Sequence, residues 1–386
     1  MMWCGCLEPF AENVAHWFAE SSAVVERRRV LKGMAAAISL PAAGCATKVP
    51  SATTAATTAP EPNIAADTLL DETISIDLHS HPGMVRALAR TTMDGHIERL
   101  AAGRVRASLF SAVGDGPVLS INPQGRISAV RQPVPDELFR ATYVQLELVR
   151  TRIAAGKLML VERTADLDRA RSQGRPAAVL AVEGGDFLEG RLDRVREAYE
   201  RGIRSIQLVH YRVNELGDIQ TEAARHGGLT PFGHDVIREM NRLGMLVDVA
   251  HATFDGVRAA AETSSKPLVL SHTFVDVPGN ARAVTREHAR LVARGGGVIG
   301  VFPVSFGGPG FSGYIDHLSR MADAVGVDHV AIGTDMDGIP FQFATFDNYS
   351  EWPSIASALM ARGYGRTDVA KVMGGNVARV LKATIG

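Results

Sequence analysis

This 386-residue chain contains 12 histidines, and five of them lie at the ends of short apolar segments. One glutamate and one aspartate lie at the ends of similar segments. Neutral imidazole and carboxylate oxygen are ligands that suit Zn2+, and also Mn2+, Co2+ or Fe2+. The three cysteines lie within the first 45 residues, so a metal site in the rest of the chain must use His, Asp and Glu. The candidates are His79, His81, Glu183, His210, His251, His272 and Asp335.

His79 and His81 end the segment IDLHSH and are separated by one residue. On an extended strand, side chains two positions apart point to the same side, so both imidazoles can reach one metal ion. A surface histidine pair is the simpler interpretation of a His-x-His motif taken alone. Its place at the end of an apolar strand favours the interpretation as a ligand pair.

Glu183 ends another apolar run, AVLAV. A carboxylate at such a place costs free energy unless a cation compensates it. A metal ion would do so, and an Arg or Lys across the mouth of a barrel would serve as well. Gly184 and Gly185 follow, which allows a sharp backbone turn and leaves room for a ligand.

His251 and His272 end two consecutive apolar runs, MLVDVAH and KPLVLSH. One histidine at a strand end is more often structural, but two beside Glu183 favour a metal site. Together with His79 and His81 they exceed the three protein ligands of a typical catalytic zinc. Such a set suits two ions about 3.5–4 Å apart, bridged by Glu183, with a hydroxide held between them as nucleophile.

Asp335 ends the run HVAIGTD. A carboxylate at this point could accept a proton from the attacking water and pass it to a leaving amine. Alternatively, Asp335 caps the following turn, because the sequence Asp335-Met336-Asp337-Gly338 is also typical of a turn. Asp337 fits the turn role better.

The elements that must position these residues alternate along the chain: a short apolar run, a polar turn and a helical stretch. Eight such units predict an α/β fold, a (β/α)8 TIM-like barrel with its metal site at the carboxyl-terminal ends of the strands. An open doubly wound sheet is the alternative, weakened because no Gly-rich dinucleotide fingerprint follows the first strand. The expected strands are 74–79, 107–113, 178–183, 205–210, 245–251, 268–272, 298–302 and 329–335; the expected helices are 136–155, 166–173, 192–200, 231–243, 254–263, 287–294 and 313–325.

Composition separates the chain into three parts. Residues 1–45 end in ERRRVLKGMAAAISLPAAGC, a basic cluster, a short apolar stretch and a cysteine, which predicts an export signal of twin-arginine type with a lipobox-like end at Cys45. Residues 46–66 are rich in Thr, Ala and Pro and predict a flexible linker, leaving 67–386 as the barrel. The expected location is therefore the periplasm of a bacterium, or its membrane through a lipid on Cys45, although a plain signal peptide remains the alternative.

Charge excludes one class of partner. Lys and Arg total 41 against 42 Asp and Glu, so the chain has no basic excess with which to neutralise a phosphate backbone. Nucleic-acid binding is therefore not expected.

The motifs resemble those of the membrane (renal) dipeptidases, the M19 metallopeptidases of the amidohydrolase-like superfamily. The matching segments run in family order over nearly all of 67–386. The longest, GLTPFGHDVIREMNRLGMLVDVAH, is also the most specific. The segments are IDLHSHPG (76–83), AVEGGDF (181–187), LVHYRVNELGD (208–218), 228–251, PLVLSH (267–272), HVAIGTDMDG (329–338) and GGNVARV (374–380).

This resemblance implies a metal site. His79 would bind the first of two divalent ions, for which Zn2+ is the first expectation, and Glu183 would bridge both ions. His251 and His272 would bind the second ion. His81 stands where the family's first strand normally carries an aspartate, so an anionic ligand is replaced by a neutral one and the site gains one unit of positive charge.

The resemblance also implies how a substrate is held. His210 would contact the substrate carbonyl and stabilise the oxyanion, and Asp335 would shuttle the proton. Arg282 would bind the free carboxylate of a dipeptide, for which the forked guanidinium is well suited. Ala283 follows it where the family often has Asn.

The expected function is therefore hydrolysis of dipeptides at a binuclear metal site, by a protein that often forms homodimers in this family. Hydrolysis of another amide, a lactone or a β-lactam is the alternative, motivated by His81. A catalytically silent surface protein that uses the barrel only for binding is a third hypothesis, opposed by the other site positions.

Overall fold

Eight parallel strands form a nearly closed barrel, as the sequence predicts, in a computed structural model. The structure describes residues 64–386 apart from 86–87, 90, 123–125, 306–309, 340–343 and 346–347, so the predicted export signal and nearly all of the linker lie outside the described residues. Neighbouring strands in the barrel follow chain order: β1 (Ile76–Ser80), β2 (Ala107–Val113), β6 (Ala177–Glu183), β7 (Ile203–Gln207), β8 (Leu246–Asp248), β9 (Val269–Thr273), β10 (Val298–Val301) and β11 (Val330–Ile332).

A buried aspartate joins the first strand of the barrel to the last. Asp77 on β1 accepts hydrogen bonds from the backbone N–H of Thr334 at 2.9 Å and from its hydroxyl at 2.6 Å. Tyr349 donates its hydroxyl to the same carboxylate at 2.7 Å. Backbone bonds from Asp335 to His79 and from His81 to Met336 continue the seam. The Asp77 carboxylate therefore connects the first strand of the barrel to the segment that follows the last strand. We call these contacts of Asp77 with Thr334 and Tyr349 the Asp77 clasp.

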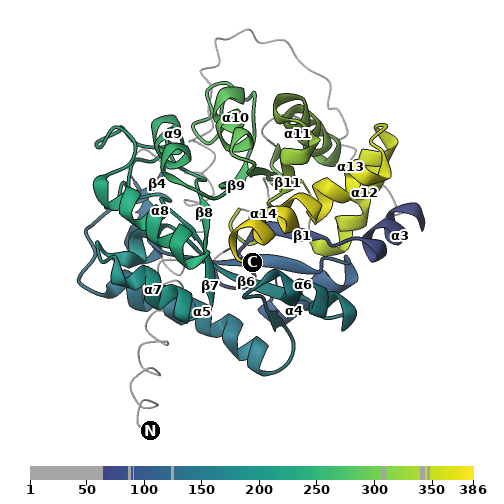
Figure 1. Cartoon of the computed structure of the whole chain (residues 1–386), viewed down its shortest axis with the longest axis horizontal. Helices are drawn as coiled ribbons and strands as arrows, with labels where there is room; N and C mark the ends of the chain where they lie inside the picture. Colours follow the sequence, from purple (N-terminus) through teal and green to yellow (C-terminus); the bar gives the residue numbers. More distant parts are fainter. Residues whose placement is uncertain are drawn as a thin grey trace, which may run out of the picture.

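Helices surround the strands, and Figure 1 shows them as a ring around the sheet. Threonines start several of them, because each threonine hydroxyl accepts a hydrogen bond from an N–H in the first turn; α4, α8, α9 and α10 begin after Thr92, Thr230, Thr253 and Thr285. The helices are α3 (Ile64–Glu72), α4 (Met93–Ala102), α5 (Glu137–Ala154), α6 (Thr164–Ser172), α7 (Asp193–Glu200), α8 (Pro231–Leu243), α9 (Phe254–Thr263), α10 (Arg286–Arg294), α11 (Gly310–Val325), α12 (Trp352–Ala361), α13 (Arg366–Ala370) and α14 (Asn376–Thr384).

The last helix closes the amino-terminal end of the barrel. Val377, Val380 and Leu381 of α14 pack in one buried cluster with the first residues of the strands, Ile76 and Val298 among them. Figure 1 shows α14 and the C-terminus across the middle of the ring of helices. With this end filled by apolar side chains, polar chemistry is confined to the other end of the barrel.

Three predicted strand ends are corrected by the structure. β7, β8 and β11 end at Gln207, Asp248 and Ile332, so His210, His251 and Asp335 lie in the loops that follow. His251 and Asp335 have φ values of 66° and 48°, in the left-handed region, which a β-strand cannot accommodate.

Smaller features also differ from the prediction. Helix α3 begins at Ile64, before the predicted start of the folded part at residue 67. β3 (Leu119–Ile121) and β4 (Ile127–Ala129) form an antiparallel hairpin beside the barrel, and β5 (Met159–Leu160) pairs with β6 from outside. In the described part of the chain, no helix combines the length and the hydropathy needed to cross a membrane.

Candidate metal centre

Glu183 lies at the centre of the candidate site, at the end of β6 and almost wholly buried. Its Oε1 faces the Nε2 atoms of His79, His251 and His272 at 3.5, 3.3 and 3.5 Å. Its Oε2 faces those of His81 and His210 at 3.1 and 3.3 Å. The structure thus brings all five predicted histidines around one carboxylate, and these residues come from the ends of five strands of the barrel or from the loops that follow them.

Asp335 completes this group from the loop after β11. Its Oδ1 lies 3.3 Å from His81 Nε2 and 4.0 Å from His79 Nε2. Three sets of residues place ligand atoms within 4.8 Å of one another: His79, His81 and Asp335; His79, Glu183 and His272; and Glu183, His210 and His251.

The donor set fits divalent ions. His79 and His81 direct their Nε2 atoms at each other across 3.1 Å, and His251 and His272 do so across 3.0 Å. A proton shared by two imidazoles can be bound to only one of the two facing nitrogens. A divalent ion, in contrast, can accept the lone pairs of both nitrogens. Imidazole and carboxylate are also the ligands that Zn2+ prefers, so the residues present fit the ions that the sequence predicts.

Hydrogen bonds at the other ring nitrogen orient three of these imidazoles, whereas Nδ1 of His251 has no partner among the described residues. His81 Nδ1 lies 2.6 Å from the carbonyl oxygen of Ser111, which can only accept, so Nδ1 carries a proton and Nε2 is the nitrogen that faces the centre of the site. The Ser271 hydroxyl lies 3.0 Å from His272 Nδ1 and 3.4 Å from His79 Nδ1. One serine therefore contacts ligands from two different strands.

Burial and charge set the ionisation of the site. Burial works against a charge on His81, but its hydrogen bonds to Asp335 and Glu183 raise its pKa to about 10, so an ion that binds Nε2 must displace the proton that these bonds hold. Burial likewise works against the Glu183 carboxylate, yet the surrounding imidazoles hold its pKa well below the usual value. Burial lowers the pKa of His251 and His272 well below 6.5, so both are neutral near pH 7, the form in which imidazole binds a metal.

Glycines allow the loops to approach closely around the ligands. Gly184, at φ 92°, directly follows Glu183, and a Cβ there would lie 2.8 Å from Asp186 Oδ2 and 3.2 Å from His210 Cβ. This confirms the predicted sharp turn, but the room beside it is filled by protein side chains. A Cβ on Gly338 would lie 1.8 Å from Asp335 Oδ1 and 2.7 Å from His81 Cδ2.

Arg282 lies beside the metal ligands, in the loop between β9 and α10. Its Nη1 donates to Gln220 Oε1 at 2.5 Å. Its Nη2 is buried and has no hydrogen-bond partner among the described residues. Burial lowers the pKa of Arg282. A buried, half-satisfied guanidinium is a suitable receptor for a carboxylate from a ligand.

His210 is held by an aspartate that the sequence analysis did not single out. Asp115 Oδ1 lies 2.7 Å from His210 Nδ1, and Asp115 Oδ2 accepts from the N–H of Tyr211 at 3.0 Å. Burial opposes a charge on His210, but Asp115 and Glu183 raise its pKa to about 8. Asp115 follows the predicted strand 107–113, so the strand-end position that identified the other residues could have identified it too.

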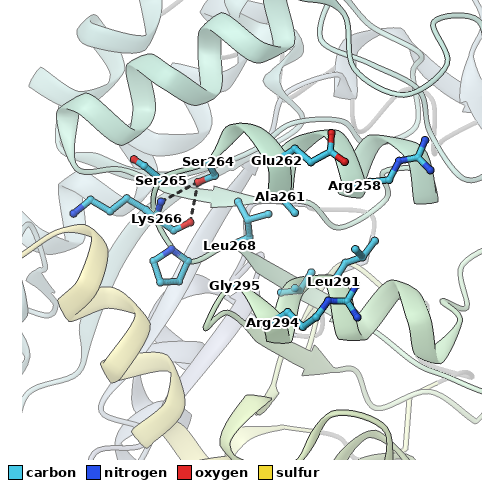
Figure 2. A pocket seen from close by; sticks show the side chains of 12 residues that line it. Arg258, Ala261, Glu262, Ser264, Ser265, Lys266, Leu268, Leu291, Arg294 and Gly295 are labelled. Atoms are coloured by element: carbon cyan, nitrogen blue, oxygen red, sulfur yellow. Dashed lines mark hydrogen bonds between the residues drawn. The ribbon is translucent and has the colours of Figure 1, made fainter.

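A surface hollow of about 400 Å³ lies away from this centre, between α9, α10 and the start of β9. Figure 2 shows Arg258, Glu262, Lys266 and Arg294 around it. Leu268 lines the hollow just before β9, whereas His272 lies near the other end of that strand. The hollow is therefore at the amino-terminal side of the barrel and is separate from the metal ligands.

A parallel α/β barrel with imidazoles and carboxylates clustered at the carboxyl-terminal ends of its strands is an arrangement in which metal-dependent hydrolases hold their ions. Comparison of the sequence with protein families narrows this class. The profile described as Membrane dipeptidase (Peptidase family M19) matches residues 64–385. The chain therefore belongs to the membrane dipeptidase family, and it is a hydrolase of the metallo-dipeptidase kind.

Curated relatives agree with this family, and solved structures share the fold of the chain. The chain is 28% identical to "Dipeptidase tcpJ" from Claviceps purpurea over 301 residues, 75% of this chain and 69% of the relative. It is 29% identical over 300 residues to "Dipeptidase verJ" from Clonostachys rogersoniana, covering 74% of each. The fold is similar to that of the probable dipeptidase PvdM from Pseudomonas aeruginosa, with a TM-score of 0.73, 17% identity and coverage of 83% and 97%.

A second structure of similar fold contains a ligand. The metallo peptidase from Rhodobacter sphaeroides has a TM-score of 0.67 and 22% identity to this chain, with coverage of 81% and 99%. Its structure was solved with a phosphinate mimic of the dipeptide L-Ala-D-Ala.

Proposed function

We propose that this protein hydrolyses dipeptides at a two-ion centre held by His79, His81, Glu183, His251 and His272. When bound, the ions would lower the pKa of a water molecule between them, so that hydroxide is available at neutral pH to attack the peptide carbonyl. The observation that carries the proposal is the convergence of five histidine Nε2 atoms on the two oxygens of Glu183.

The remaining side chains of the site have separate tasks in this reaction. His210, whose pKa is raised to about 8, carries a proton on both ring nitrogens near pH 7, so its Nε2 can donate to the carbonyl oxygen of the substrate as negative charge develops there. Asp335 accepts the proton of the attacking water and delivers it to the leaving amine. Arg282 pairs its free Nη2 with the terminal carboxylate, which selects a substrate with a free carboxylate over a neutral amide.

The neutral ligand His81 favours a second candidate function, hydrolysis of a lactone, another amide or a β-lactam at the same centre. An additional unit of positive charge strengthens the acidification of bound water but weakens retention of an ion. Initial rates on alanyl dipeptides, with L-Ala-D-Ala as the first, compared with lactones and cyclic amides, distinguish the two functions. Turnover of the cyclic substrates alone would replace the proposed dipeptidase function.

Arg282→Ala tests the assignment of the carboxylate receptor. Loss of a charge-assisted, forked contact should raise KM for dipeptides by about 30- to 100-fold, equivalent to roughly 2–3 kcal/mol, with a smaller effect on kcat. A dipeptide with an amidated C-terminus should be affected little, because it lacks the charge that Arg282 recognises. If KM rises equally for both substrates, Arg282 does not bind the carboxylate.

We also propose that the chain is exported through its leader and anchored by a lipid on Cys45. The basic cluster Arg27-Arg28-Arg29 before a short apolar stretch supports export, and Ala42-Ala43-Gly44 before the cysteine supports lipidation. Radiolabelled palmitate should label the full chain in bacterial cells, and Cys45→Ala should abolish the label. Export without any label would leave a plain signal peptide as the correct interpretation.

A further inference from the structure

Asp115 is a buried carboxyl side chain whose place in the site is set by two neighbouring strand ends. It follows β2 and precedes the short helix η1 (Gly116–Val118), and it is wholly inaccessible to solvent. The N–H of Gly114 donates to the carbonyl of Glu183 at 2.7 Å, and a Cβ on Gly114 would lie 2.1 Å from the carbonyl oxygen of Gly184. Because Gly114 has no side chain, the end of β2 packs directly against the end of β6. This packing places Asp115 in contact with His210.

The two oxygens of Asp115 have different partners. Oδ1 meets His210 Nδ1 at 2.7 Å, and Oδ2 accepts the backbone N–H of Tyr211 at 3.0 Å. Because an ionised carboxylate can only accept, the shared proton belongs to Nδ1 of the imidazole. The Tyr211 contact fixes the carboxylate against the backbone of the same loop, so the ring of His210 cannot rotate without breaking one of these bonds.

This arrangement determines which nitrogen of His210 is available for chemistry. With Nδ1 occupied, His210 presents only Nε2, and Nε2 lies 3.3 Å from Glu183 Oε2 at the centre of the site. A carboxylate behind an imidazole in this way fixes both the tautomer and the direction of the ring.

We infer that Asp115 is a positioning residue for hydrolysis, acting through His210 by holding its ring with Nε2 turned toward the substrate. The inference rests on the proposed function for its effect on rates. Its structural part, the protonated and anchored Nδ1, stands independently of the substrate.

A double-mutant cycle tests the effect on rates. Asp115→Ala should lower kcat for a dipeptide by about 10- to 100-fold, with KM within about twofold and an unchanged content of zinc per chain. In a His210→Asn background, Asp115→Ala should alter kcat by less than about twofold, because the imidazole through which Asp115 acts is already absent. An equal loss of kcat in both backgrounds, or a loss of zinc in Asp115→Ala, would overturn the inference.

Nitrogen-15 NMR of histidine-labelled, zinc-loaded protein tests the anchored proton without any substrate. The wild-type protein should show a protected Nδ1–H signal that disappears in His210→Asn, which assigns it, and that is lost or exchanges rapidly in Asp115→Ala. Asp186→Ala is the matched control, because Asp186 is another buried carboxylate at the next strand end and bonds to Arg212 and Asn214 rather than to His210.

The two measurements separate the two proposals. A wild-type protein without the Nδ1–H signal would overturn the role of Asp115 even if Asp115→Ala fails to fold. A wild-type protein that shows the signal but does not hydrolyse dipeptides would refute the proposed function and leave the anchoring of His210 intact.

Discussion

Two of the residues closest to the chemistry, His251 and Asp335, have left-handed backbone conformations that non-glycine residues adopt rarely. Such a conformation costs of order 1 kcal/mol or more and persists only where the surroundings enforce it. Here the enforcement comes from the seam between β1 and β11 for Asp335, whose N–H donates to His79, and from the N–H of Gln220, which donates to the carbonyl of His251. Backbone hydrogen bonds therefore hold both residues in the conformation that directs their side chains into the candidate site.

His81 is the residue whose substitution best tests the two-ion centre. Purified wild-type protein should contain about two zinc ions per chain and turn over alanyl dipeptides. His81→Ala should lose one ion, and its kcat should fall by at least about 100-fold. The loss of a metal ligand lowers activity more than the loss of a residue that only hydrogen-bonds to a ligand. Metal analysis and initial rates on one sample provide the measurement.

His81→Asp is the informative companion variant. An aspartate is shorter than a histidine and leaves the Ser111 carbonyl without its donor, so this change should not improve occupancy or rate. The opposite result, one ion and no turnover in the wild type with both restored by aspartate, would mean that the chain has left the chemistry of its family.

Residue types and strand-end positions were sufficient to predict which histidines meet, since parallel strands end at one face of the barrel. They were insufficient to predict the hydrogen bonds that orient the histidine rings. The bond from His81 to the Ser111 carbonyl and the contact of Ser271 with two imidazoles depend on register between strands far apart in sequence. Arg282 came only from the family resemblance, because nothing in its local sequence distinguishes it.

At the scale of elements, the loops beyond the strands carry the greater part of the site. The loop after β11 passes so close to His81 that only glycine fits at position 338. Gly338→Ala should displace Asp335, lowering kcat by at least about tenfold and the free energy of unfolding by about 1–3 kcal/mol. Steady-state kinetics and urea unfolding measure both effects.

Gly365→Ala is the control for that substitution. Gly365 precedes α13, has a negative φ, and no atom lies within 4 Å of its added Cβ. Its activity should equal that of the wild type. If Gly338→Ala is equally active, the loop after β11 has more freedom than the distances allow, and Asp335 is not held in place by it.

Elements with strong local signals were predicted to the residue, and the others were not. Helices α8 and α9 run from Pro231 to Leu243 and from Phe254 to Thr263, as expected, because a threonine caps the start of each. Helix α14 was not predicted, since its apolar residues are recognised as buried only once the barrel end they fill is known. Strands β7, β8 and β11 were predicted too long because apolar sequence continues into loops that the site bends.

At the scale of the whole molecule, acid should weaken the fold through a histidine outside the site. Burial, with Arg282 nearby, lowers the pKa of His288 on α10 from 6.5 to about 4. Since the unfolded chain takes up this proton more readily, the stability contribution is complete above pH 6.5 and falls as the pH drops toward 4. The loss attributable to His288 between pH 8 and pH 5 is about 2 kcal/mol.

His288→Gln isolates this contribution. The wild-type protein should lose about 2 kcal/mol more than the variant between pH 8 and pH 5 in urea unfolding, since glutamine does not titrate. Protonation of the metal ligands affects both proteins and cancels in the difference. Parallel pH profiles for the two proteins would show that His288 is accessible to protons in the folded state.

The Asp77 clasp has a consequence for the order of events during synthesis. Asp77 and Thr334 lie 257 positions apart, and the histidines of β1 and Asp335 are separated by nearly the same length of chain. At about 5–20 residues per second, β1 waits roughly 13–50 s for Thr334 to emerge from the ribosome. A nascent chain that stops short of β11 therefore holds an open sheet that lacks Asp335, although the proposed ligands up to His272 are already made. Hydrolytic activity should therefore appear only after β11 has closed the barrel, whereas ions could bind earlier.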